Sequence, residues 1–133
     1  MTAEEFVMAS CKALECEVHY DTENEEWQLE IHFEGKRKQH VTLFSFEESG
    51  RSLVRCVTAV GNANDFSHAQ LVTALELNES LLYGAFAIFS GKFVITACTD
   101  AVEQEVPRFV EVIRYLTRMA DAYEKMVFGL DRG

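Results

Sequence analysis

Two sets of side chains in this sequence are of the types that bind metal ions. The first is an acidic segment that contains Asp21, Glu23, Glu25 and Glu26. Its spacing is similar to that of a calcium-binding loop, but Glu26 stands where such a loop needs a glycine for its sharp turn. The second set is the histidines, His19, His32, His40 and His68. No cysteine or carboxylate completes a zinc set with them at metal-ligand spacing. We interpret the acids as a solvated turn and the histidines as surface residues, and we expect no metal and no other cofactor.

Motifs for nucleophilic or nucleotide chemistry are absent from the sequence. It contains no phosphate-binding loop, dinucleotide fingerprint, nucleophile elbow or zinc-protease helix, and its seven glycines are scattered. The four thiols, without paired spacing, are Cys11, Cys16, Cys56 and Cys98. Cys98 lies near the end of a predicted strand, but no sequence signature pairs it with a base. These absences argue against most common classes of enzyme, and we expect the thiols to be small core residues in a reducing compartment.

Length and charge limit the classes of protein that remain. The chain has 133 residues, of which 22 are acidic and 12 basic, so its net charge is −10. This length fits a single domain over residues 1–133. The negative charge disfavours nucleic acid and anionic membrane surfaces as partners, because both would be repelled. The first residues include two acids and no apolar run, so we expect no signal peptide and a cytoplasmic location.

Capping residues and helical spacing predict three helices. A helix over residues 3 to 15 follows a capping box that begins at Thr2. A second helix begins at Asp65 or Ser67 and ends at Asn78. The third starts at Pro107 and ends near Gly129, with apolar side chains at alternating steps of four and three. This apolar stripe is short for a free-standing coiled coil, so we expect the third helix to pack on the sheet of its own chain.

Period-two alternation predicts the strands. The clearest strand contains Trp27, Leu29 and Ile31 on one face and charged or polar residues on the other. Residues 40 to 46 and 52 to 60 continue an antiparallel meander, and the latter is apolar on both faces, which is typical of a central strand. Residues 82 to 89 and 92 to 98 flank a tight Ser90-Gly91 turn. Residues 16 to 20 alternate too, either as a short strand or as the approach to one.

The predicted fold is α+β, with the element order α-β-β-β-α-β-β-α and an antiparallel sheet packed against helices. Two features predict a binding surface: the nearly wholly apolar strands of residues 82 to 98 and the apolar stripe of the last helix. The candidate protein-binding or dimer-forming residues are Leu82, Phe86, Ile88, Phe109, Ile113, Leu116, Met119 and Tyr123. The alternative is that both features simply form the core of the monomer.

The order of elements resembles the fold shared by YbjN-domain proteins and class I type III secretion chaperones. The resemblance covers nearly the whole chain, and three local segments accompany it. These are Leu77-Asn78 followed by Leu82-Tyr83-Gly84-Ala85-Phe86, the turn Ser90-Gly91-Lys92, and Ala120-Asp121-Ala122-Tyr123.

The resemblance implies a non-enzymatic homodimer that binds a polypeptide client in extended form through apolar patches. An acidic surface would keep such a dimer in solution and would attract a basic client. The alternative function is a small α+β enzyme or ligand-binding domain. Its pocket would lie between helix and sheet, lined by residues such as Cys56, Cys98 or Tyr83.

Overall fold

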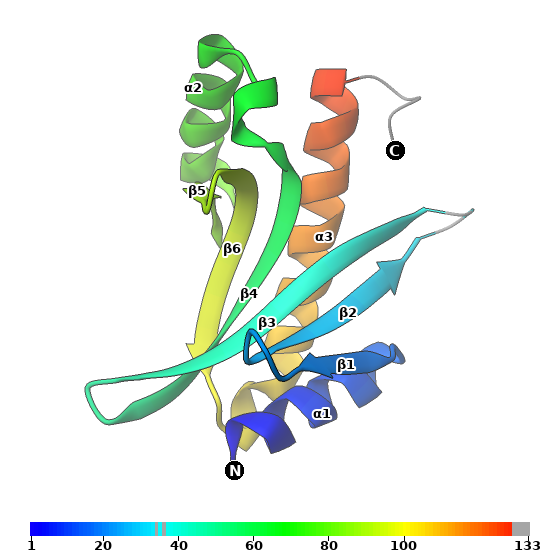
Figure 1. Ribbon diagram of the computed structural model, residues 1–133, viewed down its shortest axis with the longest axis vertical. Coiled ribbons are helices and arrows are strands. Elements are labelled where there is room, and N and C mark those ends of the chain that lie inside the picture. The colour runs from blue at the N-terminus through cyan, green and yellow to red at the C-terminus, as the bar shows by residue number, and fades with distance from the viewer. Residues whose placement is uncertain (34, 36, 129–133) are drawn as a thin grey trace.

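A computed structural model describes residues 1–33, 35 and 37–128 (Figure 1). The fold is α+β and is built on a six-stranded antiparallel sheet with the strand order β1-β2-β3-β4-β6-β5. The strands are β1 (Val18–Asp21), β2 (Glu26–His32), β3 (Lys38–Glu48), β4 (Arg51–Asn62), β5 (Ala85–Phe89) and β6 (Lys92–Asp100). The helices are α1 (Ala3–Leu14), α2 (His68–Leu77) and α3 (Val106–Phe128). The fold class predicted from the sequence is confirmed.

The helices begin where the capping residues predict. The Thr2 hydroxyl accepts the Glu5 amide at the start of α1, and the Ser67 hydroxyl accepts the Gln70 amide at the start of α2, each within a complete capping box. Ser67 rather than Asp65 is therefore the cap of α2, and Asn78 ends that helix. The predicted left-handed cap at Gly129 lies outside the described residues.

The meander of β2, β3 and β4 is as predicted, and β4 lies centrally between β3 and β6. The segment that the alternation left open is a strand, β1, which pairs with β2 from Val18 to Asp21. The last hairpin differs from its prediction at one end. β5 begins at Ala85 rather than at residue 82, because Gly84 adopts a left-handed conformation (φ +72°) that interrupts an extended chain.

Both α1 and α3 cover the same face of the sheet, and α3 runs along β4 and β6 (Figure 1). The core lies between these helices and the sheet, and includes Phe6 of α1, Leu43 of β3, Ile95 of β6 and Ile113 of α3, each 1% exposed or less. The third helix thus packs on its own sheet, as the sequence predicts. None of the described helices is long and apolar enough to cross a membrane.

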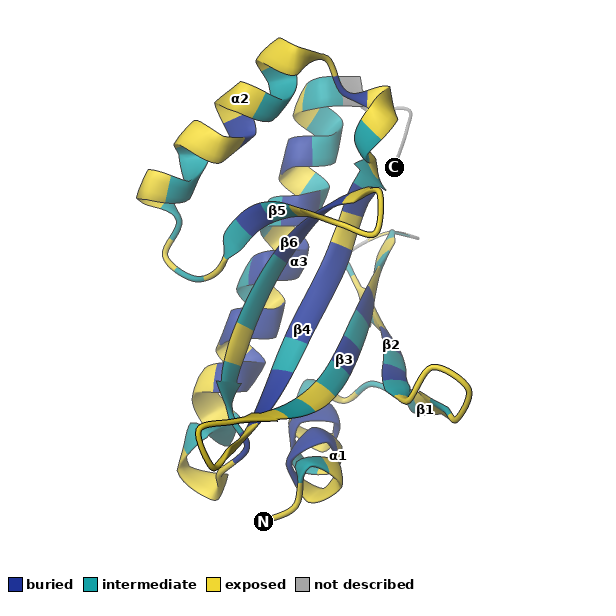
Figure 2. Cartoon of the chain, turned by 60° about the vertical axis from the view of Figure 1, so that its left-hand side comes forward, coloured by how far each residue is buried: buried dark blue, intermediate teal, exposed yellow. Residues whose placement is uncertain are grey.

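The second face of the sheet has no helix over it. In Figure 2 the strands β3, β4 and β6 lie in front of α3, and no described helix lies between them and the viewer. α2 stands at one end of the sheet, where it contacts β5 and reaches α3 through a hydrogen bond from the Tyr123 hydroxyl to the Gln70 carbonyl (2.5 Å). We call the uncovered side the open face.

Candidate functional site

The eight residues predicted to bind a partner differ in how far they are exposed to solvent. Five of them are 3% exposed or less and fill the space between α3, β5 and the rest of the sheet: Phe86, Phe109, Ile113, Leu116 and Tyr123. Their side chains form the monomer's own core and offer no surface to a partner while the chain is folded. Met119 is half-buried. Leu82 and Ile88 are exposed, at 69% and 59% of their surface.

Leu82 precedes β5 and Ile88 lies in it, and α2, which contacts β5, carries further exposed apolar side chains. Val72 and Leu75 of α2 are 39% and 55% exposed, and Ala74 is the one fully buried residue of that helix. We call Val72, Leu75, Leu82 and Ile88 the α2–β5 edge. β5 is the last strand of the described sheet, and the backbone amide and carbonyl of Phe86 in that strand bind the Asn78 side chain instead of another strand.

A second apolar surface, which was not selected from the sequence, lies on the open face. Phe44 and Phe46 of β3 project there beside Val57 of β4, and Phe89 of β5 and Val94 of β6 join them. We call these five residues the open-face patch. Phe89 is half exposed, at 50%. In register, Phe44 pairs with Arg55 and Thr42 pairs with Val57, so the patch spans neighbouring strands of the sheet.

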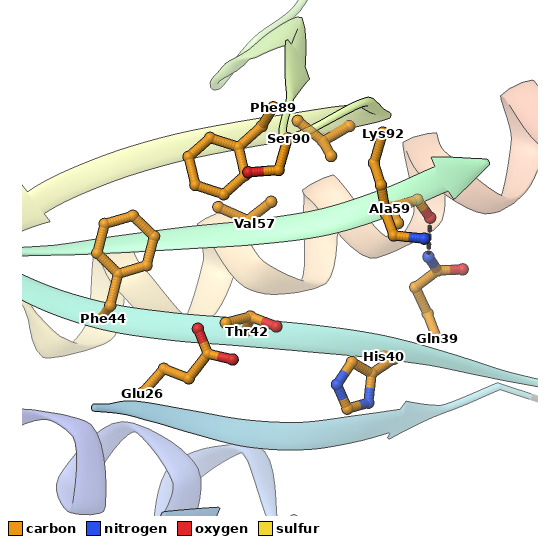
Figure 3. Close-up of a pocket in the computed structure, with 11 residues that line it drawn as sticks. Glu26, Gln39, His40, Thr42, Phe44, Val57, Ala59, Phe89, Ser90 and Lys92 are labelled. Atoms are coloured by element: carbon orange, nitrogen blue, oxygen red, sulfur yellow. Dashed lines mark hydrogen bonds between the residues drawn. The ribbon is translucent and has the colours of Figure 1, made fainter. Parts of the chain in front are cut away.

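Phe44 and Phe89 meet across the sheet. Their strands are separated by β4 and β6 in the order of the sheet. Their rings nevertheless stack with centroids 6.2 Å apart and planes 20° apart. The two rings therefore lean over Val57 and Val94, which are only 8% and 2% exposed although no helix covers them. Figure 3 shows Phe44 and Phe89 on either side of Val57.

This aromatic bridge separates two shallow hollows of about 430 and 410 Å³. Phe44, Val57, Phe89 and Val94 line both of them. The first hollow has a polar border that includes Glu26, His40 and Lys92 (Figure 3). The second is lined mainly by apolar side chains and by Arg55, whose guanidinium carbon lies 5.4 Å from the centroid of the Phe46 ring. The two hollows share four lining residues and therefore adjoin at the aromatic bridge.

Toward β2 the open face becomes polar. The Thr42 hydroxyl donates to the Gln28 side-chain oxygen (3.0 Å), and the Gln28 amide donates to Glu26 (2.6 Å). His40 also contacts the Gln28 oxygen. These cross-strand contacts order polar side chains at the margin of the open-face patch.

The residues named for the alternative function do not enclose a pocket between helix and sheet. The space around Cys56, Ile113 and Leu116 is too small to hold a water molecule. Burial raises the pKa of the Cys56 thiol to about 12, which keeps it protonated and unreactive. Cys98 and Tyr83 line a shallow surface groove, where the Tyr83 hydroxyl donates to Glu111 and this bond raises the phenol pKa.

Metal-binding groups are not assembled in the part of the chain that the structure describes. There, no three residues of the types His, Cys, Asp and Glu are placed to hold an ion. All four histidines are exposed, as predicted. Arg37, which precedes β3, forms a partly buried ion pair with Asp121 of α3, and Asp121 also pairs with Lys125 (3.4 Å).

The described elements define a type III secretion chaperone-like fold, with one sheet face covered by helices and the other open. The chain is similar to a chain in the solved structure of the HopA1–SchA chaperone–effector complex, with a TM-score of 0.62 over 92% of each chain. The two sequences are 13% identical, so this likeness shows a shared fold. No model of a protein family and no curated protein matches the sequence. Membership of the YbjN family therefore stays a prediction.

Proposed function

We propose that this chain is a non-enzymatic, chaperone-like module that binds an extended polypeptide client on its open face and forms a homodimer. The observation that carries the proposal is the open-face patch, an aromatic surface that no described helix covers. In this proposal residues 1–133 form one domain, and the protein is YbjN-like and cytoplasmic, as expected from the sequence. It is supported by the similarity in fold to a chain of a chaperone–effector complex.

A polypeptide suits this surface better than a small molecule does. Ligand pockets for small molecules bury most of the ligand in a concave site. The two hollows are instead shallow and adjoin each other at Phe44 and Phe89. An extended segment could place one apolar side chain in each hollow and pass over the aromatic bridge between them. Side chains two residues apart point the same way in such a segment, at a distance of roughly 7 Å.

The client site can be tested with peptides selected from a phage-displayed random library. Phe89→Ser should weaken binding of selected peptides at least about tenfold, since it removes a partly exposed ring from both hollows. Met8→Ser is the matched control, because Met8 on α1 is exposed to nearly the same extent (48% against 50% for Phe89) and lies outside both the open-face patch and the α2–β5 edge. Peptides that bind both variants as tightly as the unchanged chain would contradict the proposed site.

The α2–β5 edge is the proposed dimer interface, and Leu82 and Ile88 are its members among the residues predicted from sequence. A stable dimer buries roughly 1,000 Å² or more, and an exposed apolar edge of a sheet is otherwise an aggregation hazard. Light scattering should give twice the 15.1 kDa mass of one chain. Ile88→Asp should lower the mass to that of one chain, whereas Phe89→Ser should leave the dimer intact. A monomer at micromolar concentration would refute this part.

A further inference from the structure

We propose that the open face selects client segments in which an acidic side chain stands beside apolar ones, and that Arg55 is the residue that recognises the acid. The inference rests on the proposed protein-binding function and names the chemistry of the client. It concerns the hollow formed by Phe44, Phe46, Phe89 and their neighbours around Arg55.

Arg55 occupies the middle of the sheet rather than a hairpin tip. It lies in the central strand β4, opposite Phe44 on β3 and Cys98 on β6. Its guanidinium rests over the Phe46 ring, with 5.4 Å between the guanidinium carbon and the ring centroid. A cation held against an aromatic face loses part of its rotational freedom before a ligand arrives.

The N–H donors of the Arg55 guanidinium are available to a ligand. Arginine carries five N–H donors in a planar fork that matches a carboxylate, and the guanidinium of Arg55 makes neither a hydrogen bond nor an ion pair with any residue in the described part of the chain. Two other strand cations do pair with acids: Lys38 lies 3.0 Å from Glu30, and Arg51 makes a two-pronged contact with Asp100 at 2.9 and 2.7 Å. Lys92 of β6 donates to the Asn62 side chain (3.3 Å).

This contrast is informative because the chain has 22 acidic residues and only 12 basic ones. An arginine in such a chain has many possible carboxylate partners, yet none lines the hollow in which Arg55 lies. Arg55 is the one charged residue among the side chains that line it. A client carboxylate bound there would be flanked by phenyl rings that exclude water, which strengthens a charge-assisted hydrogen bond.

The net negative charge of the protein favours a basic client, whereas Arg55 favours an acidic side chain at one position of the client. Charges more than about 10 Å apart are largely screened at physiological salt, so the direct contact decides preference at this hollow. We therefore expect a client segment that combines apolar residues with an aspartate or glutamate, rather than a uniformly basic one.

The test uses the full chain and a random peptide library displayed on phage with each peptide fused through its C-terminus. This format leaves no free C-terminal carboxylate, so any acid that is enriched is a side chain. Peptides selected on the unchanged chain should be enriched in Asp or Glu next to apolar residues. Peptides selected on the Arg55→Gln variant should lack this enrichment. Peptides selected on the Arg118→Gln variant should keep it, because Arg118 is exposed on α3, on the helix-covered side of the sheet.

One selected peptide, made with an amidated C-terminus, and its Glu→Gln analogue then complete a double-mutant cycle by fluorescence anisotropy. Arg55→Gln should weaken binding of the acidic peptide about tenfold and leave binding of the analogue within about twofold. Its urea midpoint should match that of the unchanged chain. Selection of peptides without acids, or equal loss for both peptides, overturns the inference and leaves the protein-binding proposal in place. Failure to select any peptide overturns both.

Discussion

Replacing Gly84 with alanine tests how closely β5 and the segment before it approach the rest of the fold. A methyl group at this position would lie 2.6 Å from the Thr96 carbonyl oxygen and 2.8 Å from a Leu116 methyl carbon. The backbone at Gly84 also has φ +72°, a left-handed conformation that favours glycine. Gly84→Ala therefore combines a backbone penalty with two steric contacts, and the contact with a backbone oxygen cannot be relieved by a rotamer change.

The cost follows from the structure. The left-handed conformation costs alanine roughly 1–2 kcal/mol, and forcing a methyl into a packed site costs about 1–3 kcal/mol more. The unfolded chain loses freedom when glycine is replaced, which returns roughly 0.4–1 kcal/mol. We expect Gly84→Ala to lower the free energy of unfolding by about 3 kcal/mol.

Gly50 supplies a matched control. Its φ is +76°, but a methyl group there would have nothing within 4 Å. Gly50→Ala should cost about 1 kcal/mol or less, because it carries only the backbone penalty. Urea unfolding can be followed by the fluorescence of Trp27, the only tryptophan, which is 8% exposed in the core. All variants should be compared at one protein concentration, since the proposed dimer would make stability depend on it.

Equal losses at Gly84 and Gly50 would refute the reasoning, because they would leave no contribution from the contacts with Thr96 and Leu116. A second measurement tests the Leu116 contact alone. Gly84→Ala should be less destabilising in a Leu116→Val background, where the contacting methyl is gone, than in the unchanged chain. Additive losses would show that Leu116 does not restrict this position.

Three further predictions concern Asn78 and the thiols. The Asn78 side chain accepts the Phe86 amide (2.6 Å) and donates to the Phe86 carbonyl (3.2 Å), so Asn78→Ala should cost about 1–3 kcal/mol in urea unfolding; an unchanged midpoint would contradict it. Burial raises the pKa of the Cys11 and Cys56 thiols from 9.0 to about 12. Between pH 9 and pH 12 these thiols therefore ionise in the unfolded chain only, so the free energy of unfolding should fall as the pH rises through this range. Exposed Cys98 should react with a thiol reagent in the folded chain while Cys11 and Cys56 do not; rapid labelling of all three would refute the burial.

Local chemistry was enough to predict most of the fold. Capping boxes at Thr2 and Ser67 set the starts of α1 and α2, and alternation set β2, because each signal depends only on residues close in sequence. The start of β5 could not be set in this way. Residues 82 to 86 are apolar enough for a strand, but Gly84 turns left-handed where the chain must pass close to Thr96, a contact that exists only after β6 has paired.

The candidate site was harder to predict, since burial depends on which face of an element meets the rest of the chain. Phe109 and Tyr123 formed an apolar stripe that suited either a core or an interface, and only the position of α3 over β4 and β6 assigned them to the core. Phe44 and Phe46 carried the signal that could have found the open-face patch. They alternate with buried Val41 and Leu43, so β3 is apolar on both faces, and helices cover one face only.

The side chains along the open face indicate that folding alone does not require the open-face patch. Along β2 the open face carries Glu26, Gln28 and Glu30, so this architecture forms with polar residues on its uncovered side. On the same face, Phe44 and Phe46 lie on the next strand, β3, and Phe89 lies on the far edge strand, β5, and no described helix packs on them. Since polar side chains satisfy the fold at β2, the fold alone does not require phenyl rings at β3 and β5. Exposed aromatic area favours association with another molecule, and a sheet that changes from polar to aromatic across one face is therefore what the proposed client site predicts.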